Sequence, residues 1–164
     1  MKALSLQYKL VNSIAFICWL CLIFLPNFKL IDTLIAQVVV IGLALFYSYL
    51  LFVKKDIAGA LYPKGNFTTL EGVVNLFKNP RGVLVGWVHY LAFDLLVGLH
   101  IKASANAMGM SHWVQIPCFI LTLFFGPLGY LHFFILNKLL YKKWVGAITK
   151  NKNGCKKLQP SFSL

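Results

Sequence analysis

The apolar residues of the chain fall into four long blocks, which short polar stretches separate. The blocks run from about 8 to 25, 33 to 53, 82 to 101 and 113 to 136. Each is close to the roughly 20 residues that an α-helix needs to cross a bilayer. The pattern therefore predicts an all-α, polytopic membrane protein with four transmembrane helices.

A fifth, shorter pattern lies in the polar stretch between the second and third blocks. Apolar residues recur at helical spacing over about 69–78, and Thr68 and Glu71 fit a capping box that would begin a helix there. We expect a short amphipathic helix at this place. Two positions are open for it: the membrane interface, or a site packed on the ends of the bundle.

Composition supports a membrane protein. Apolar residues make up 59% of the chain and charged residues 12%, whereas a soluble domain would carry about a quarter charged residues. The net charge of +12 does not indicate a nucleic-acid partner, because the basic residues cluster in the gaps between apolar blocks. The positive-inside rule then puts 14 of the 16 basic residues on the cytoplasmic side, leaving only Lys29 and Lys102 opposite.

This charge pattern also divides the chain into parts. Both termini are predicted to be cytoplasmic, with a single transmembrane domain over 1–140 and a basic cytoplasmic tail over 141–164. The lysines of the tail should favour an anionic membrane surface. A protein partner or an oligomer is compatible with the sequence, which does not identify one.

The third block contains the residue that most opposes membrane insertion, Asp94. It is one of four acidic residues in the chain and the only one inside an apolar block. At about 100° per residue, Asp94 shares a helix face with Tyr90, Trp87 and Gly98. His89 lies roughly 140° away by the same geometry, so it should not pair directly with Asp94.

The fourth block offers a partner for Asp94. Pro127 cannot donate a backbone hydrogen bond, and its ring frees the carbonyl of Leu123. An antiparallel pairing of the third and fourth blocks puts Asp94 level with Leu123, with Thr122 just beyond. Because burial favours the uncharged carboxyl group, a protonated Asp94 is predicted to donate to the Leu123 carbonyl or to Thr122.

Two interpretations of these polar residues remain open. In one, Asp94, His89 and His132, which this pairing puts on the same half of the membrane as His89, are structural contacts between helices. In the other, they line a membrane-embedded pocket that handles protons or binds the polar group of a lipid-like substrate. Gly126 and Gly129 would let a helix or a flat ligand approach closely. The histidines lack metal-ligand spacing, so we expect no metal and no cofactor.

Two stretches between Phe67 and Leu136 carry a resemblance to a known family. They read FTTLEGVVNLFKNPRGVLVGWVHYLAFDLLVG and GMSHWVQIPCFILTLFFGPLGYL. They resemble the abscisic acid deficient 4 family, small four-helix membrane proteins whose plant members are needed to form neoxanthin from violaxanthin, an epoxide-to-allene rearrangement of a xanthophyll. After Gly98 the chain departs from the family pattern, and it has no transit peptide. Both points indicate a bacterial member in the inner membrane, for which neoxanthin is not the expected product.

The resemblance implies a function that involves a carotenoid or another isoprenoid lipid. We expect the protein to bind or isomerise such a lipid, with Asp94 and His89 as the catalytic residues. The residues expected to bind the ligand are Trp87, Tyr90, Phe93, Gly98, Thr122, Gly126, Pro127, Gly129 and His132. The alternative is a non-catalytic accessory or assembly protein, in which Asp94 serves only as a contact between helices.

Overall fold

The protein is all-α in the computed structural model, which describes residues 2–53 and 63–150, with the backbone alone at 53 and over 140–150. Four helical stretches are long and apolar enough to cross a membrane, which confirms the predicted class. The elements in chain order are α1 (Lys2–Phe24), α2 (Lys29–Leu34), η1 (Ile35–Val40), α3 (Ile41–Ser48), η2 (Tyr49–Val53), α4 (Leu70–Lys78), α5 (Pro80–Ala107) and α6 (His112–Lys150).

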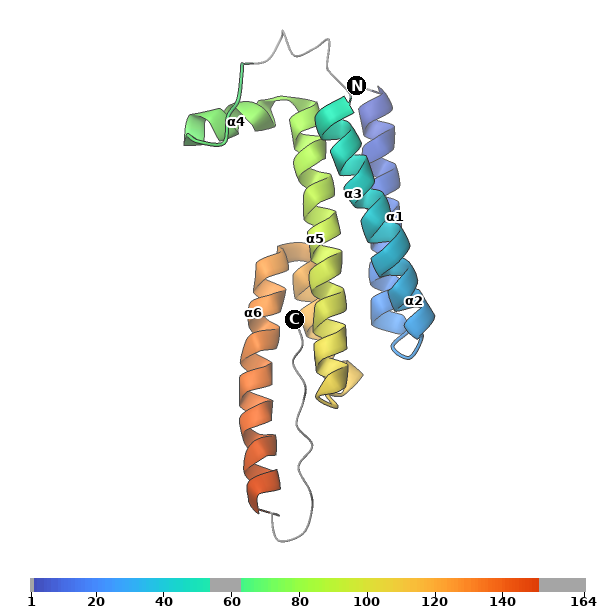
Figure 1. Ribbon diagram of the computed structural model, residues 1–164, viewed down its shortest axis with the longest axis vertical. Helices are drawn as coiled ribbons and strands as arrows, with labels where there is room; N and C mark the ends of the chain where they lie inside the picture. Colours follow the sequence, from blue (N-terminus) through green and yellow to red (C-terminus); the bar gives the residue numbers. More distant parts are fainter. Residues whose placement is uncertain (1, 54–62, 151–164) are drawn as a thin grey trace.

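Helix α5 is the centre of the bundle, with α1, α3 and α6 packed around it (Figure 1). Its start is fixed by Asn79, whose side chain accepts a hydrogen bond from the Arg81 amide at 2.9 Å, and by Pro80 in the first turn. Proline is favoured there because the first amides of a helix have no partner within the helix. The helix ends before Gly109, which takes the left-handed conformation at φ 66°.

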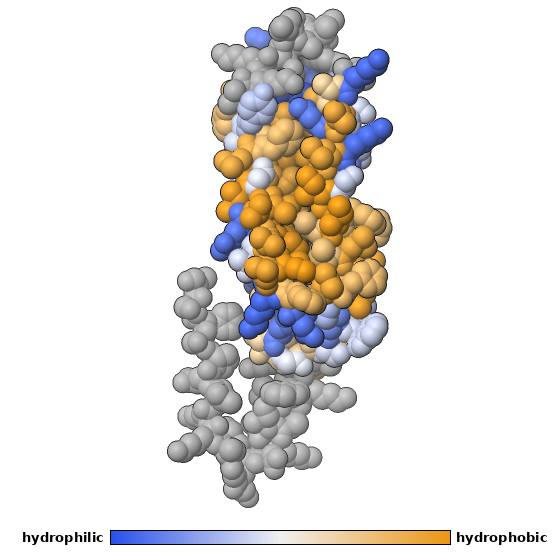
Figure 2. Space-filling model, turned by 90° about the vertical axis from the view of Figure 1, so that its right-hand side faces the viewer, coloured by the Kyte–Doolittle hydropathy of each residue, from blue (hydrophilic) through white to orange (hydrophobic). Residues whose placement is uncertain are grey.

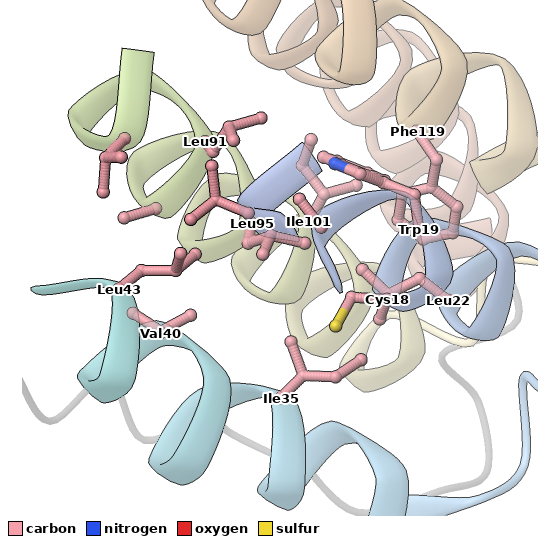
Figure 3. Packing of buried hydrophobic residues seen from close by; sticks show 14 of the residues in the cluster. Cys18, Trp19, Leu22, Ile35, Val40, Leu43, Leu91, Leu95, Ile101 and Phe119 are labelled. Carbon is pink, nitrogen blue, oxygen red and sulfur yellow. The ribbon is translucent and has the colours of Figure 1, made fainter. Parts of the chain in front are cut away.

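The packed core is a narrow seam along α5. Trp19 and Leu22 of α1 meet Leu95 and Ile101 of α5 and Phe119 of α6, all with almost no exposed surface (Figure 3). Most other large apolar side chains face outward. They form a broad apolar band with hydrophilic residues toward both ends (Figure 2). A surface of this kind suits a hydrocarbon environment, because a soluble protein rarely exposes such a large apolar area.

The second membrane-spanning stretch, Lys29–Phe52, is not a regular α-helix. The π-helical segments η1 and η2 interrupt it, a feature that the apolar pattern did not predict. The last of these segments is tied to α5, because the buried guanidinium group of Arg81 donates to the carbonyl of Leu50. This bond gives a polar partner to a backbone group at a place where helical bonding is irregular.

Helix α6 doubles back on itself. Phe125 has non-helical angles, φ −142° and ψ 45°, and the ribbon reverses there, so that α6 has a first arm (112–124) and a second arm (126–150) (Figure 1). A Cβ added at Gly129 would collide with Thr122, which shows that the arms touch. The ring of Tyr130 lies 5.9 Å from that of His100. A straight α6 would instead carry Tyr130 toward the first half of α5.

The break in α6 has a local cause in the sequence. Pro127 removes one helical hydrogen bond and crowds the carbonyl of Leu123, and Gly126 allows the backbone to turn without a side chain in the way. As a result, the end of α6 lies at the end of the bundle opposite α4 and the start of α1 (Figure 1). The predicted tail over 141–164 begins within α6 and continues beyond the described residues.

Helix α4 begins one residue later than its sequence pattern indicates. Thr69, and not Thr68, caps it by accepting a hydrogen bond from the Gly72 amide at 3.0 Å. Thr68 is engaged instead by Asn66, whose side-chain oxygen accepts hydrogen bonds from the amide and hydroxyl groups of Thr68 and Thr69. The capping box failed because a neighbouring asparagine accepts from both threonines and fixes the turn.

Candidate functional site

Asp94 lies in the middle of α5 and faces the break in α6. It is 6% exposed, and its Oδ2 atom is fully buried without a hydrogen-bond partner among the described residues. Its Oδ1 atom abuts Gly126, where an added Cβ would collide with it. A buried oxygen without a partner is costly in an apolar environment, so this arrangement needs either a compensating contact or a functional reason.

Tyr90, one helical turn before Asp94, supplies the nearest polar group. Its hydroxyl group donates to the carbonyl of Leu123 at 3.4 Å and also interacts with the Asp94 carboxyl group. The carbonyl that Pro127 frees therefore does find a donor, as expected, but the donor is Tyr90. The prediction that Asp94 would donate to Leu123 was wrong, because the longer tyrosine side chain on the same helix face reaches the carbonyl first.

Thr122 is also engaged elsewhere. It is fully buried and donates to the carbonyl of Cys118, one turn earlier in α6, at 2.7 Å. The second arm of α6 passes directly over it at Gly129. The predicted hydrogen bond from Asp94 to Thr122 is therefore absent from the structure. The close approach expected at Gly126 and Gly129 does occur, to Asp94 and to the first arm of α6 respectively.

An aromatic row leads away from Asp94 along α5 and α1. The ring centroid of Trp87 lies 5.5 Å from that of Tyr90 and 5.8 Å from that of Tyr8. Asn12 of α1 accepts a hydrogen bond from the Trp87 indole at 2.8 Å and so holds this ring in place. The sequence analysis missed Tyr8 and Asn12. Asn12 is a polar residue within the first apolar block, but no spacing rule links it to a residue 75 positions away.

His89 lies on a different face of α5 from Asp94, as helical geometry predicted. Its ring is 5.5 Å from that of Tyr47 and 4.5 Å from that of Phe93. The structure therefore does not bring the two expected catalytic residues together. His132 is separate from both. It belongs to the second arm of α6, where its neighbour Tyr130 packs on His100 in the far half of α5.

The expectation that His132 shares a half of the membrane with His89 was therefore wrong, because it assumed a straight α6. Gly98 also has a different neighbour from the one expected. A Cβ at this position would lie 2.7 Å from the Trp19 ring of α1, so the glycine makes room for a core side chain. This contact explains the glycine without a ligand.

The site can perform limited but definite chemistry. A carboxyl group and a phenol lie side by side, facing a break in a helix, within an apolar environment. Together they can exchange a proton with, or hydrogen-bond to, one oxygen atom of an otherwise apolar molecule. No three His, Cys, Asp or Glu side chains in the described ranges lie close enough together to bind a metal ion.

Comparison with known protein families matches most of the chain. The family model described as ABA DEFICIENT 4-like matches residues 6–133 of the 164, which include most of α1, all of α5, the break in α6 and every residue of the site around Asp94. No curated protein and no solved structure matches the chain.

Proposed function

Since the chain belongs to the ABA DEFICIENT 4-like family, we propose that it binds and isomerises an oxygen-bearing isoprenoid lipid of the carotenoid class at Asp94. The observation that carries this proposal is the buried Oδ2 atom of Asp94, which has no partner among the described residues and has the Tyr90 hydroxyl group beside it. An ionisable residue within the membrane is by default a candidate for function.

The proposed chemistry is acid–base and needs no cofactor. For an epoxide-bearing lipid, the Asp94 carboxyl group donates its proton to the epoxide oxygen as the carbon–oxygen bond breaks, and this oxygen becomes a hydroxyl group. A neighbouring carbon then loses a proton, which returns to the carboxylate, and a new carbon–carbon double bond forms. Atoms and electrons balance, so the net change is an isomerisation. Tyr90 replaces His89 as the second polar group, because only Tyr90 lies beside Asp94.

The access route is proposed from the lipid side. Trp87 and Tyr8 are both partly exposed on the outer surface of the bundle, and the reversal of α6 leaves the first turns of α5 without α6 beside them (Figure 1). A long apolar molecule can therefore lie along the aromatic row from the hydrocarbon and place its oxygen at Asp94. Offset contact with aromatic rings suits a conjugated chain.

A test in cells compares Asp94→Asn with Asp94→Leu. Both variants remove the proton donor, but asparagine keeps the hydrogen-bonding capacity of the site. In bacteria that accumulate an epoxycarotenoid, product formation should fall at least about a hundredfold in both variants, the size of effect expected for a lost acid–base group. Ser104→Ala, on the same helix outside the site, serves as the matched control. Full product formation by Asp94→Asn at normal protein levels would rule out proton transfer by Asp94.

A second candidate function is a non-catalytic accessory or assembly protein. The contact between Asp94 and Gly126, together with the hydrogen bond from Tyr90 to Leu123, favours it, because these contacts hold the break in α6 against α5. In that case Asp94→Asn should behave like the wild type and Asp94→Leu should fail to accumulate. Lipid extraction and mass spectrometry of the purified protein adds an independent measurement, since the first proposal expects a bound isoprenoid.

We also propose that the protein resides in a bacterial inner membrane, with the N-terminus and α4 on the cytoplasmic side. The first span supports this orientation by the positive-inside rule, because Lys2 and Lys9 lie in its first turns at this end and Lys29 alone lies just after it. Lys64 and Lys78 lie at the same end, whereas the lysines of the second arm of α6 lie toward the other.

A further inference from the structure

Helix α4 lies outside the bundle, and its last turn packs against the start of α5. It runs across the end of the bundle instead of along it (Figure 1). A Cβ at Gly86 of α5 would lie 2.8 Å from the Phe77 ring, and one at Gly82 would collide with the Leu76 carbonyl. The two glycines of α5 therefore let the end of α4 pack tightly against the first turns of the membrane span.

The exposed face of α4 is apolar. Leu70 is 82% exposed and Val74 47% exposed, and Phe77 shares their face at helical spacing. Phe67, just before the helix, is 84% exposed. We call these four residues the α4 stripe. The opposite side of the helix is covered by the preceding loop, because Gly72 packs on Asn66 and Leu76 packs on Gly65. Among the described residues, Gly86 of α5 covers one edge of Phe77, and the rest of the α4 stripe stays exposed.

The polar residues of α4 lie on a different side from the stripe. At about 100° per residue, Glu71, Asn75 and Lys78 fall together, about 80–140° away from Leu70 and about 40–100° away from Val74. Lys78 donates to the Asn75 side chain at 2.9 Å, which holds this side polar and outward. The division into one apolar and one charged face is typical of a helix that lies in a membrane interface.

The depth of α4 relative to α5 decides what covers the stripe. The Phe77 ring meets Gly86, which is six residues beyond Pro80, or about 9 Å along the helix axis. The apolar part of α5 begins at Gly82 and Val83, so the stripe is level with the first turns of the membrane span. An interfacial helix typically buries its apolar face about 5–10 Å into the boundary between headgroups and acyl chains, which matches this level.

We infer that α4 is a docking surface for an anionic lipid bilayer, with the α4 stripe among the acyl chains and Glu71, Asn75 and Lys78 toward water. The positive charge at this end of the chain indicates a lipid with negatively charged headgroups. The exposed side chains of Lys2, Lys9, Lys64 and Lys78 lie at this end of the described chain, and Glu71 of α4 is the acidic residue beside them. Negatively charged headgroups attract such a set of lysines. This inference does not depend on the chemistry proposed for Asp94.

The test uses the full chain in nanodiscs with an environment-sensitive fluorophore on single cysteines. Cys18, Cys21, Cys118 and Cys155 are first replaced by alanine or serine, and circular dichroism checks that the helices are retained. Val74→Cys and Asn75→Cys then form a matched pair of adjacent residues about 100° apart around the helix, one on the apolar side and one on the polar side. With phosphatidylglycerol in the nanodisc, a water-soluble quencher should quench the label at 74 at least threefold less than the label at 75.

The composition of the nanodisc tests the charge part of the inference. Replacing phosphatidylglycerol by phosphatidylcholine, or raising the salt concentration, should increase quenching at 74 and leave quenching at 75 unchanged. Equal quenching at both positions in phosphatidylglycerol would overturn the inference and make the stripe a surface for a protein partner. Strong protection at 74 with no dependence on lipid charge or salt would overturn the preference for anionic lipid.

Discussion

At the scale of single residues, Asp94 and Tyr90 show how the length of a side chain decides which of two polar groups hydrogen-bonds to a backbone carbonyl in an apolar environment. Both side chains lie on one face of α5 and both can approach the carbonyl of Leu123. The tyrosine hydroxyl group makes the bond, and the Oδ2 atom of Asp94 stays buried without a partner in the described chain. Tyr90 thus provides the hydrogen-bond donor for the Leu123 carbonyl at the helix break. The Asp94 carboxyl group is left available for a ligand.

Replacing Tyr90 by phenylalanine should lower both the stability of the protein and its product formation. The variant leaves the Leu123 carbonyl without its donor, which should cost about 1–3 kcal/mol of unfolding free energy. Product formation in the epoxycarotenoid strain should fall as well. Thermal unfolding in detergent measures the first effect and pigment analysis the second. Tyr47→Phe removes the same hydroxyl group from the aromatic stack at His89 and serves as the control. Equal effects of the two substitutions would contradict the role given to Tyr90.

Gly126 provides a steric test of the same site. Gly126→Ala puts a methyl group against Oδ1 of Asp94, so either the carboxyl group or the helix break must move. We expect a loss of about 1–3 kcal/mol, the usual cost of overpacking. Gly42→Ala is the matched control, because no described atom lies within 4 Å of its Cβ position. Since alanine is the better helix former, Gly42→Ala should stabilise the protein slightly in thermal unfolding. A neutral Gly126→Ala would mean that Asp94 and Gly126 do not touch.

At the scale of helices, α6 and the second span depart most from the expected pattern. A run of apolar residues long enough to cross the membrane is here folded into two arms, held together by the contact of Gly129 with Thr122. The reversal puts Tyr130 beside His100 instead of near Trp87. It also leaves the aromatic row of Trp87 and Tyr8 facing lipid, which the proposed access route requires.

Chemical cross-linking of cysteine pairs in the otherwise cysteine-free protein tests the reversal of α6. A short bifunctional thiol reagent should join the pair Tyr130→Cys and His100→Cys in membranes, because the parent rings are 5.9 Å apart. The pair Tyr130→Cys and Trp87→Cys, which a straight α6 would bring together, should not cross-link. Gel electrophoresis after treatment with the reagent shows which pair is joined. The opposite result would mean that α6 crosses the membrane as a straight helix.

At the scale of the whole molecule, two sets of polar contacts connect the helices at the end of the bundle that lies opposite α4. Lys102, almost completely buried, forms an ion pair with Asp32 of α2 at 2.6 Å and also donates to the Leu25 carbonyl at 3.4 Å. The His112 ring nitrogen lies 2.7 Å from the carbonyl of Ile23. These contacts join α1, α2 and α5 to the start of α6 at the end of the bundle opposite α4.

The side of the membrane on which α6 ends follows from its fold. Reporter fusions at the N-terminus and after Lys150, the last described residue of α6, should give opposite results, with activity for a cytoplasmic reporter only at the N-terminus, because the second arm of α6 returns toward the Lys102 end (Figure 1). The positive-inside rule alone predicts the same side for both fusion points. A fusion after Lys102 serves as an internal reference for the non-cytoplasmic side. Cytoplasmic signals from both fusions would favour the straight helix.

The sequence by itself determined the features that depend on neighbouring residues. Apolar runs predicted the four long helices, because a backbone in lipid must satisfy its hydrogen bonds within the segment. Helical geometry placed His89 and Asp94 on different faces, and Pro127 marked a carbonyl that would need a donor. Family membership also followed from two local motifs in α4 to α6, and the family match over 6–133 confirms it.

Only the tertiary structure decided which distant groups meet. The bond from Trp87 to Asn12, the choice of Tyr90 over Asp94 as donor to Leu123, and the packing of Gly98 on Trp19 all join residues far apart in the chain. The reversal at Phe125 was also undetermined, since proline and glycine can kink a membrane helix or turn it back, and packing between the arms selects the outcome. Such choices depend on the fit of whole side chains against one another, which residue spacing does not encode.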